Sequence, residues 1–111
     1  YPFWLAPEQV RLLPVTDEVQ PYAEQLLDQL TKAGVRATVD RSGERLGKLI
    51  RTGEQMKIPV LAVIGAKEAE QNAVSLRSRR DGDLGVKSVT DLLTVAQTAN
   101  DQRLAGLELK P

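Results

Sequence analysis

The sequence predicts one α/β domain built on a mixed β-sheet with helices on both faces. Apolar segments of strand length alternate with segments of helical periodicity, and 111 residues is the size of a single domain. The connector at 65–72, between the last two predicted strands, is too short for a parallel crossover. We therefore expect three parallel strands followed by an antiparallel one.

The first third of the chain predicts a strand and a helix. An extended segment at 2–7 leads to a strand at 10–15, which Pro14 ends. Pro21 suits the first turn of a helix, and Gly34 is placed to terminate it. The apolar side chains between these two positions recur at helical spacing: Ala23, Leu26, Leu27, Leu30 and Ala33.

The middle of the chain repeats this alternation. A strand at 35–39 is followed by a polar turn at 40–43 and by a helix at 44–56. The segment at 58–64 is almost continuously apolar, which is typical of a central strand covered on both faces. Right-handed crossovers then place these strands parallel to the first one.

The last third supplies the antiparallel strand and a closing helix. The charged connector at 65–72 has room for one helical turn, and the segment at 73–80 alternates apolar and polar side chains. Residues 81–83 have the composition of a turn. Ser88 is suited to cap a final helix, and leucines in the tail indicate that the tail packs on the core.

The composition argues against chemistry within this chain. It contains no cysteine and no histidine, so disulfides, thiolate catalysis and the commonest general base are excluded. Phosphate-binding motifs of the GxGxxG and GKS types are absent. No apolar run approaches the roughly 20 residues of a membrane span. Because no signal peptide is visible and the chain begins on Tyr1, we expect a piece of a longer cytoplasmic protein.

The charges are unevenly distributed. The net charge is zero, yet residues 36–80 hold ten basic and five acidic side chains, which gives this segment +5 and the remainder −5. Local potential governs association with phosphates, so the segment can form a basic face for nucleic acid. A solvated surface of mixed charge is the alternative that composition leaves open.

Three short segments have side chains suited to contact RNA. The turn at Gly43 lies at the carboxyl end of a parallel strand, where open α/β sheets bind ligands. Glu68 can accept hydrogen bonds from the two adjacent donors on the pairing edge of guanine. Arg77 and Arg79 share one strand face, from which a guanidinium can fork onto a base or phosphate. The structural alternatives are a capped loop, a surface glutamate, and charges that protect an edge strand.

Taken in order, these segments resemble the C-terminal anticodon-binding domain of class IIa synthetases, in its threonyl form. The resemblance covers the chain up to about Asn100 and implies a five-stranded mixed sheet flanked by three helices. It is carried by Phe3-Trp4-Leu5-Ala6-Pro7-Glu8-Gln9-Val10, Ala33-Gly34-Val35-Arg36, Asp40, Glu44-Arg45-Leu46-Gly47, Ile50-Arg51, Ile58-Pro59, Gly65-Ala66-Lys67-Glu68, Val74-Ser75-Leu76-Arg77-Ser78-Arg79-Arg80 and Asp83-Leu84-Gly85.

This resemblance implies a role in threonyl-tRNA aminoacylation. Residues 1–111 then form one domain, cut from the C-terminus of a longer threonine–tRNA ligase, that holds the anticodon stem-loop of tRNA-Thr. The parent enzyme would use ATP, magnesium and zinc in domains absent here, and would form a homodimer through those domains. Neither a cofactor nor a metal is expected in this chain, and neither DNA nor a membrane is an expected partner.

The resemblance also assigns residues to the anticodon. Threonine codons begin with A and C, so their anticodons share guanine and uracil at the second and third positions. Glu68 and Arg77 are implied to be the base-reading pair, with Arg51 beside them, and Gly43 and Arg79 complete the expected tRNA site.

Two positions depart from the family pattern. Gly43 stands where an asparagine is usual, which shifts readout toward backbone groups, and Lys48-Leu49 replaces an aromatic residue followed by lysine. The alternative function is therefore a non-catalytic paralogue that uses the domain to bind RNA or protein. A small phosphate-binding flavodoxin-like module is a third hypothesis, based on Asp17 and Asp40 near the carboxyl ends of strands.

Overall fold

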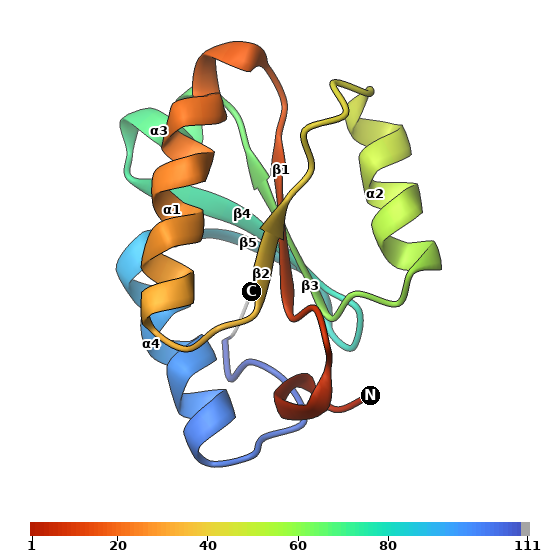
Figure 1. The fold of residues 1–111 in the computed structure, drawn as a ribbon, viewed down its shortest axis with the longest axis vertical. Helices are drawn as coiled ribbons and strands as arrows, with labels where there is room; N and C mark the ends of the chain where they lie inside the picture. The colour runs from red at the N-terminus through yellow and green to blue at the C-terminus, as the bar shows by residue number, and fades with distance from the viewer. Residues whose placement is uncertain (110–111) are drawn as a thin grey trace.

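The computed structural model describes residues 1–109 and has the predicted mixed sheet (Figure 1). The strand order is β2-β1-β3-β4-β5. Strands β1, β2 and β3 are parallel, whereas β4 runs antiparallel to both β3 and β5, as the short connector predicts. The strands are β1 Val10–Pro14, β2 Ala37–Val39, β3 Val60–Ile64, β4 Ala73–Ser78 and β5 Gly82–Ser88.

Helices cover both faces of this sheet. Helices α1 and α4 pack on one face and α2 on the other (Figure 1). The connector at 65–72 contains a short fourth helix, α3, in addition to the three predicted ones. The helices are α1 Gln20–Lys32, α2 Leu46–Gln55, α3 Ala66–Glu70 and α4 Val89–Asp101.

The N-terminal segment differs from the prediction. Residues 2–7 were expected to be extended, but Phe3–Leu5 form a 3-10 helix. The Phe3 side chain is fully buried, and its backbone N–H donates to the Ala105 carbonyl at 2.8 Å. This turn lets one aromatic side chain reach the core while the segment stays attached to the tail.

The five-stranded sheet that the resemblance implies is confirmed, but the residue pattern did not locate β5. Residues 81–83 were expected to be a turn, whereas Gly82 begins β5. Glycine and aspartate are depleted in strands, so the composition of this segment hides its conformation. Gly82 and Gly85 have φ angles of 80° and 77°, and the ladder shifts register beside Arg77. Because β5 forms the edge, β4 lies inside the sheet.

The helix boundaries follow the local signals. Pro21 lies in the first turn of α1, and Gly34 follows its end with a φ of 81°. The Ser88 hydroxyl accepts a hydrogen bond from the Asp91 backbone N–H at 3.0 Å, which confirms Ser88 as the N-cap of α4.

The core has two unequal parts. The larger one lies between the sheet and helices α1 and α4, and Leu107 of the tail is buried in it as predicted. The smaller one lies under α2. It contains only four buried side chains: Leu13, Leu49, Ile58 and Leu61. Helix α2 therefore covers the β1 and β3 part of its face and leaves the β4 and β5 part open, where Arg77 and Val86 are exposed.

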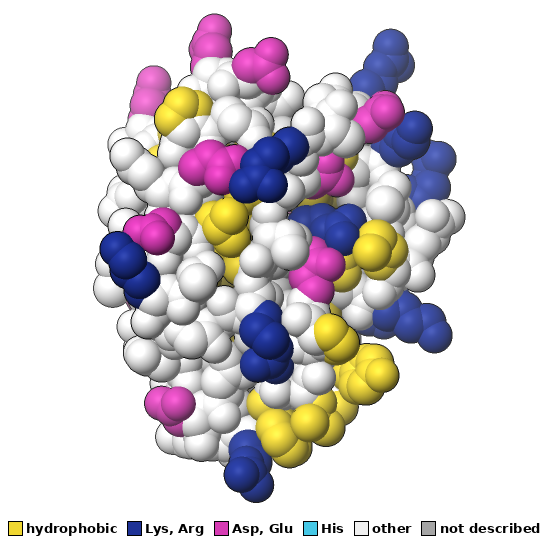
Figure 2. Space-filling view, in the orientation of Figure 1, with side chains coloured by type: hydrophobic (Ala, Val, Ile, Leu, Met, Phe, Trp, Pro, Cys, Tyr) yellow, Lys and Arg dark blue, Asp and Glu magenta, His cyan; other side chains and the backbone are white. Residues whose placement is uncertain are grey.

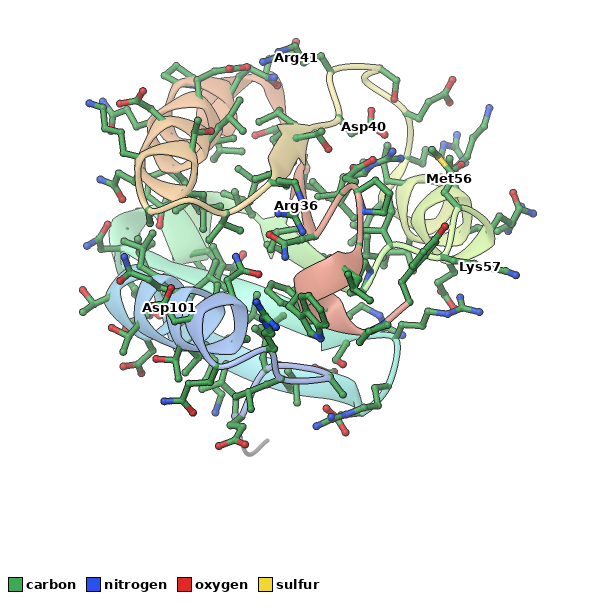
Figure 3. The ribbon with its side chains drawn as sticks, turned by 60° about the horizontal axis from the view of Figure 1, so that its bottom comes forward. Arg36, Asp40, Arg41, Met56, Lys57 and Asp101 are labelled. Carbon is green, nitrogen blue, oxygen red and sulfur yellow. The ribbon has the colours of Figure 1, made fainter. Side chains whose placement is uncertain are left out.

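A buried amide joins distant parts of the chain. The Gln9 side chain is fully buried, and its Nε2 donates to the Phe3 carbonyl at 2.8 Å and to Asn100 Oδ1 at 2.5 Å. Its Oε1 accepts from Arg36 N at 3.0 Å and from Asn100 Nδ2 at 3.2 Å. The Arg36 side chain in turn donates to the Trp4 carbonyl at 2.8 Å, and Figure 3 shows it turned toward the N-terminal helix.

Candidate nucleic-acid interface

The open side of α2 forms a two-part cleft. A hollow of about 390 Å³ lies between the end of α2 and strands β3 and β4, and a second of about 410 Å³ follows α2 itself. Both are lined by Glu54. The first is also lined by Ile58, Leu61, Arg77, Ser78, Arg79 and Gly82, and the second by Gly47, Ile50, Arg51 and Gln55. Guanidinium groups thus line both parts of the cleft, above two buried side chains of the smaller core.

Arg77 presents an exposed guanidinium in this cleft. It lies in β4, opposite Leu61 of β3 on one side and Asp83 of β5 on the other. Within residues 1–109 its side chain has no hydrogen-bond or ion-pair partner. The edge-protection interpretation of this arginine is wrong, because β4 is an interior strand. Its guanidinium is available to a base or a phosphate.

Arg79 borders the same hollow in a different way. Strand β4 ends at Ser78, and the Arg79 backbone N–H donates to the Pro59 carbonyl at 2.8 Å. Its Nη1 donates to the Glu54 carbonyl near the end of α2 at 2.9 Å. Arg77 and Arg79 thus line one hollow, as their spacing predicts, but the Arg79 guanidinium already donates a hydrogen bond within the protein.

Positive charge gathers on the α2 side of the molecule. Figure 2 shows Lys and Arg side chains along the edge where Figure 1 draws α2. Of the basic side chains at 36–80, five have no hydrogen-bond or ion-pair partner among residues 1–109: Arg45, Arg51, Lys57, Lys67 and Arg77. The first three lie before, within and after α2, and Figure 3 shows Lys57 beyond the end of this helix.

Glu54 is a member of the cleft that the sequence analysis missed. Its exposed side chain lies between the two hollows, where it lines both of them. The available signal was its spacing from Arg51, since residues three apart share one face of a helix. This acidic side chain limits the positive potential at the centre of the cleft.

Glu68 is less exposed than predicted. Its Oε1 accepts a hydrogen bond from the Gly65 backbone N–H at 2.7 Å, which closes the first turn of α3. Burial, and then the negative charge of Glu68, raise the pKa of Tyr22. The Tyr22 hydroxyl donates to the Ala73 carbonyl at 2.8 Å. Glu68 therefore lies beyond the carboxyl end of β3, close to α1.

Glu68 and Arg77 lie at different levels of the sheet. Arg77 pairs with Leu61, three residues before Ile64 ends β3. At a rise of roughly 3.3 Å per residue, Arg77 lies about 10 Å below the end of that strand, and Glu68 lies above it. Glu68 and Arg77 thus lie at separate levels, one beyond the end of β3 and the other beside its second residue.

The loop before α2 exposes its backbone at Gly43. Gly43 has a φ of 74°, and, its two chain neighbours aside, no atom of residues 1–109 lies within 4 Å of the place that a Cβ would occupy. The Ser42 N–H donates to Asp40 Oδ1 at 2.9 Å, and Arg41 pairs with Glu24 of α1 at 2.7 Å. Figure 3 shows Asp40 and Arg41 where this loop leaves β2. The loop thus leaves open space on the side of Gly43 where a side chain would stand.

Two other kinds of site were sought in the described part of the chain. No group of three or more acidic side chains among residues 1–109 is arranged to hold a metal ion. Nor does any helix in that range combine the length and the apolar character needed to cross a membrane.

Comparison with known sequences places the chain among anticodon-binding domains. Residues 9–98 match the family described as "Anticodon binding domain". The chain is 91% identical over 109 residues to a threonine–tRNA ligase of Synechococcus sp. (strain CC9605) and 57% identical over 99 residues to that of Thermosynechococcus vestitus. These alignments cover 98% and 89% of this chain but only 18% and 16% of the ligases.

Solved structures agree with this placement. The RNA-binding domain of threonyl-tRNA synthetase from Cryptosporidium parvum Iowa II superposes with a TM-score of 0.83 and 25% identity, over 96% of this chain and 26% of that one. Histidyl-tRNA synthetase from Nostoc sp. PCC 7120 superposes with a TM-score of 0.75 and 27% identity, over 80% of this chain and 21% of that one.

Proposed function

The chain belongs to the anticodon-binding domain family, and we propose that it binds the anticodon stem-loop of tRNA-Thr within a longer threonine–tRNA ligase. The observation that carries the proposal is the exposed guanidinium of Arg77 in one hollow of the cleft, whose second hollow, along α2, is lined by Arg51. In this proposal, other parts of the ligase activate threonine with ATP, hold magnesium and zinc, and form the dimer contacts. The whole enzyme acts in the cytoplasm.

The two walls of the cleft suit a single-stranded loop. The guanidinium groups of Arg51 and Arg77 can bind phosphates or base edges, and their planes can stack on a base. The backbone at Gly43 adds a donor and an acceptor beside open space.

Glu68 retains the capacity to recognise guanine at the second anticodon position. Each carboxylate oxygen has two lone pairs, and only one hydrogen bond to Oε1 is made, from Gly65. The two adjacent donors of guanine can still be accepted. Arg77, lying about 10 Å lower by strand rise, then contacts the neighbouring uracil or its phosphate.

Replacing Arg77 with alanine tests this assignment. We expect tRNA-Thr binding to weaken by about 1–3 kcal/mol, or about 5- to 150-fold, because a bidentate contact to a base edge is lost. The loss should shrink on transcripts that already carry the wrong third anticodon base, which makes the experiment a double-mutant cycle. Lys32→Ala is the control, because it removes one exposed positive charge from α1 on the opposite face.

Glu68 needs a variant that keeps its structural hydrogen bond. Glu68→Ala removes the acceptor for Gly65 as well as the proposed guanine contact, so loss of stability would accompany loss of binding. Glu68→Gln keeps one acceptor oxygen and should lose preference for guanine at the second position while its melting temperature stays near that of the parent. If both Arg77→Ala and Glu68→Gln keep the parent's affinity ratio between cognate and swapped anticodons, the base-reading assignment is wrong.

Variants of Gly43 are expected to show whether the loop needs glycine for its backbone conformation or for close contact with RNA. A valine at a φ of 74° is strained, so Gly43→Val should lower the free energy of unfolding by about 1–2 kcal/mol and weaken tRNA binding. Gly43→Asn should be tolerated, because asparagine adopts this conformation more readily, and should bind tRNA at least as well. Thermal unfolding and filter binding measure the two effects. Equal stability and affinity for all three proteins would place this loop outside the site.

A further inference from the structure

Arg79 links the two walls of the cleft. Its Nη1 donates to the Glu54 carbonyl of α2 at 2.9 Å, and its backbone N–H donates to the Pro59 carbonyl at 2.8 Å. The first hydrogen bond ties the end of β4 to α2, and the second ties it to the loop that precedes β3. A guanidinium at the C-terminal end of a helix is also favoured by the helix dipole.

Helix α2 has few other attachments to the sheet. Apart from Gly53, its one buried side chain is Leu49, which packs in the smaller core of four residues. The loop before α2 is exposed from 41 to 45. Moreover, β4 and β5 contribute no side chain to the smaller core by which α2 packs on the sheet. The hydrogen bond from Arg79 is thus a side-chain link between α2 and the end of β4.

We propose that Arg79 is a positioning residue for the anticodon site. It sets the distance between α2, which carries Arg51, and β4, which carries Arg77, so that both guanidinium groups meet one RNA loop. The inference rests on the proposed function of the cleft. It assigns Arg79 a role through the protein rather than the direct tRNA contact that its spacing from Arg77 predicts.

The salt dependence of binding separates the two roles. A phosphate contact adds about 0.7 to the slope of log K against log salt for a single strand, and its removal subtracts that amount. Arg79→Ala should weaken binding of the chain to tRNA-Thr about fivefold, since coupled neighbours interact by this order, and should change the slope by no more than Arg51→Ala does. Arg80→Ala is the matched control: it removes an adjacent exposed arginine that pairs with Asp81 at 3.2 Å and does not line the cleft between α2 and β4.

Coupling to Arg51 gives a second readout. Once α2 is displaced, Arg51 no longer meets the RNA, so the double variant of Arg51→Ala and Arg79→Ala should lose less affinity than the product of the two single losses. Without RNA, Arg79→Ala should also raise the amide hydrogen exchange of α2, which Arg80→Ala should leave as in the parent.

The outcomes separate this inference from the function on which it rests. If Arg51→Ala and Arg77→Ala leave tRNA affinity unchanged, the proposed function fails. If they weaken binding while Arg79→Ala behaves like Arg80→Ala, the function stands and the positioning role is overturned. The role is also overturned if Arg79→Ala lowers the salt slope by about 0.7 and the affinity loss of the double variant equals the product of the losses of Arg51→Ala and Arg79→Ala. It is overturned as well if the amide hydrogens of α2 exchange as slowly in Arg79→Ala as in the parent.

Discussion

Replacing Gln9 with leucine is expected to lower the free energy of unfolding by about 3–5 kcal/mol. Leucine is of similar size, but it leaves the Arg36 N–H, the Phe3 carbonyl and the Asn100 amide without the partners that Gln9 provides. Each buried polar group that loses its partner costs about 1–3 kcal/mol. Because domains of this size are stable by only about 5–15 kcal/mol, the melting temperature should fall by about 10 °C or more.

A second glutamine provides the control for this substitution. Gln29 is exposed on α1, so Gln29→Leu makes the same chemical change where water replaces any lost hydrogen bond. It should alter the free energy of unfolding by less than about 0.5 kcal/mol. Denaturant unfolding of both variants measures the difference. A Gln9→Leu protein within 1 kcal/mol of the parent, judged by the same extrapolation, would contradict the buried network.

The two glycines of α2 are expected to respond in opposite directions to leucine. A Cβ at Gly53 would lie 2.6 Å from Leu61 Cδ2, whereas none of the surrounding atoms lies within 4 Å of one at Gly47. Gly53→Leu should therefore lower the free energy of unfolding by about 3 kcal/mol, the upper end of the effect of overpacking. Gly47→Leu should raise it by about 0.5–1 kcal/mol, because leucine favours a helix more than glycine does.

Gly53→Leu should also affect function. The new side chain pushes α2 away from Leu61 and changes the position of Arg51 relative to Arg77. Weaker tRNA binding is expected at temperatures where the variant is still folded, as circular dichroism would verify. If Gly53→Leu is as stable as Gly47→Leu, the close contact between α2 and β3 is not a constraint on this helix.

Local signals predicted much of the fold. Pro21, Gly34 and Ser88 marked helix ends because each acts on the backbone next to it. The short connector after Ile64 was enough to predict an antiparallel β4. The residue pattern did not locate β5, because this strand forms by pairing with β4, which overrides the low strand propensity of Gly82.

The candidate site was predictable in part, for a related reason. Residue type and spacing singled out Arg77, the family resemblance added Arg51, and each of them lines one of two hollows that share Glu54. The sequence could not indicate that the Arg79 side chain bonds a carbonyl 25 residues away, or that Glu68 caps α3. Such partners depend on tertiary packing, which residue type and spacing do not encode.

The amide pair between Gln9 and Asn100 has a consequence for folding kinetics. These side chains are 91 residues apart in sequence, so the loop that they close spans most of the chain. Contacts of such long range form late, because loop closure must precede any gain from them. During synthesis, the Gln9 amide then gains its Asn100 partner only after the last turn of α4 has been made. Disruption of this pair should therefore act mainly on the unfolding rate and leave the folding rate almost unchanged.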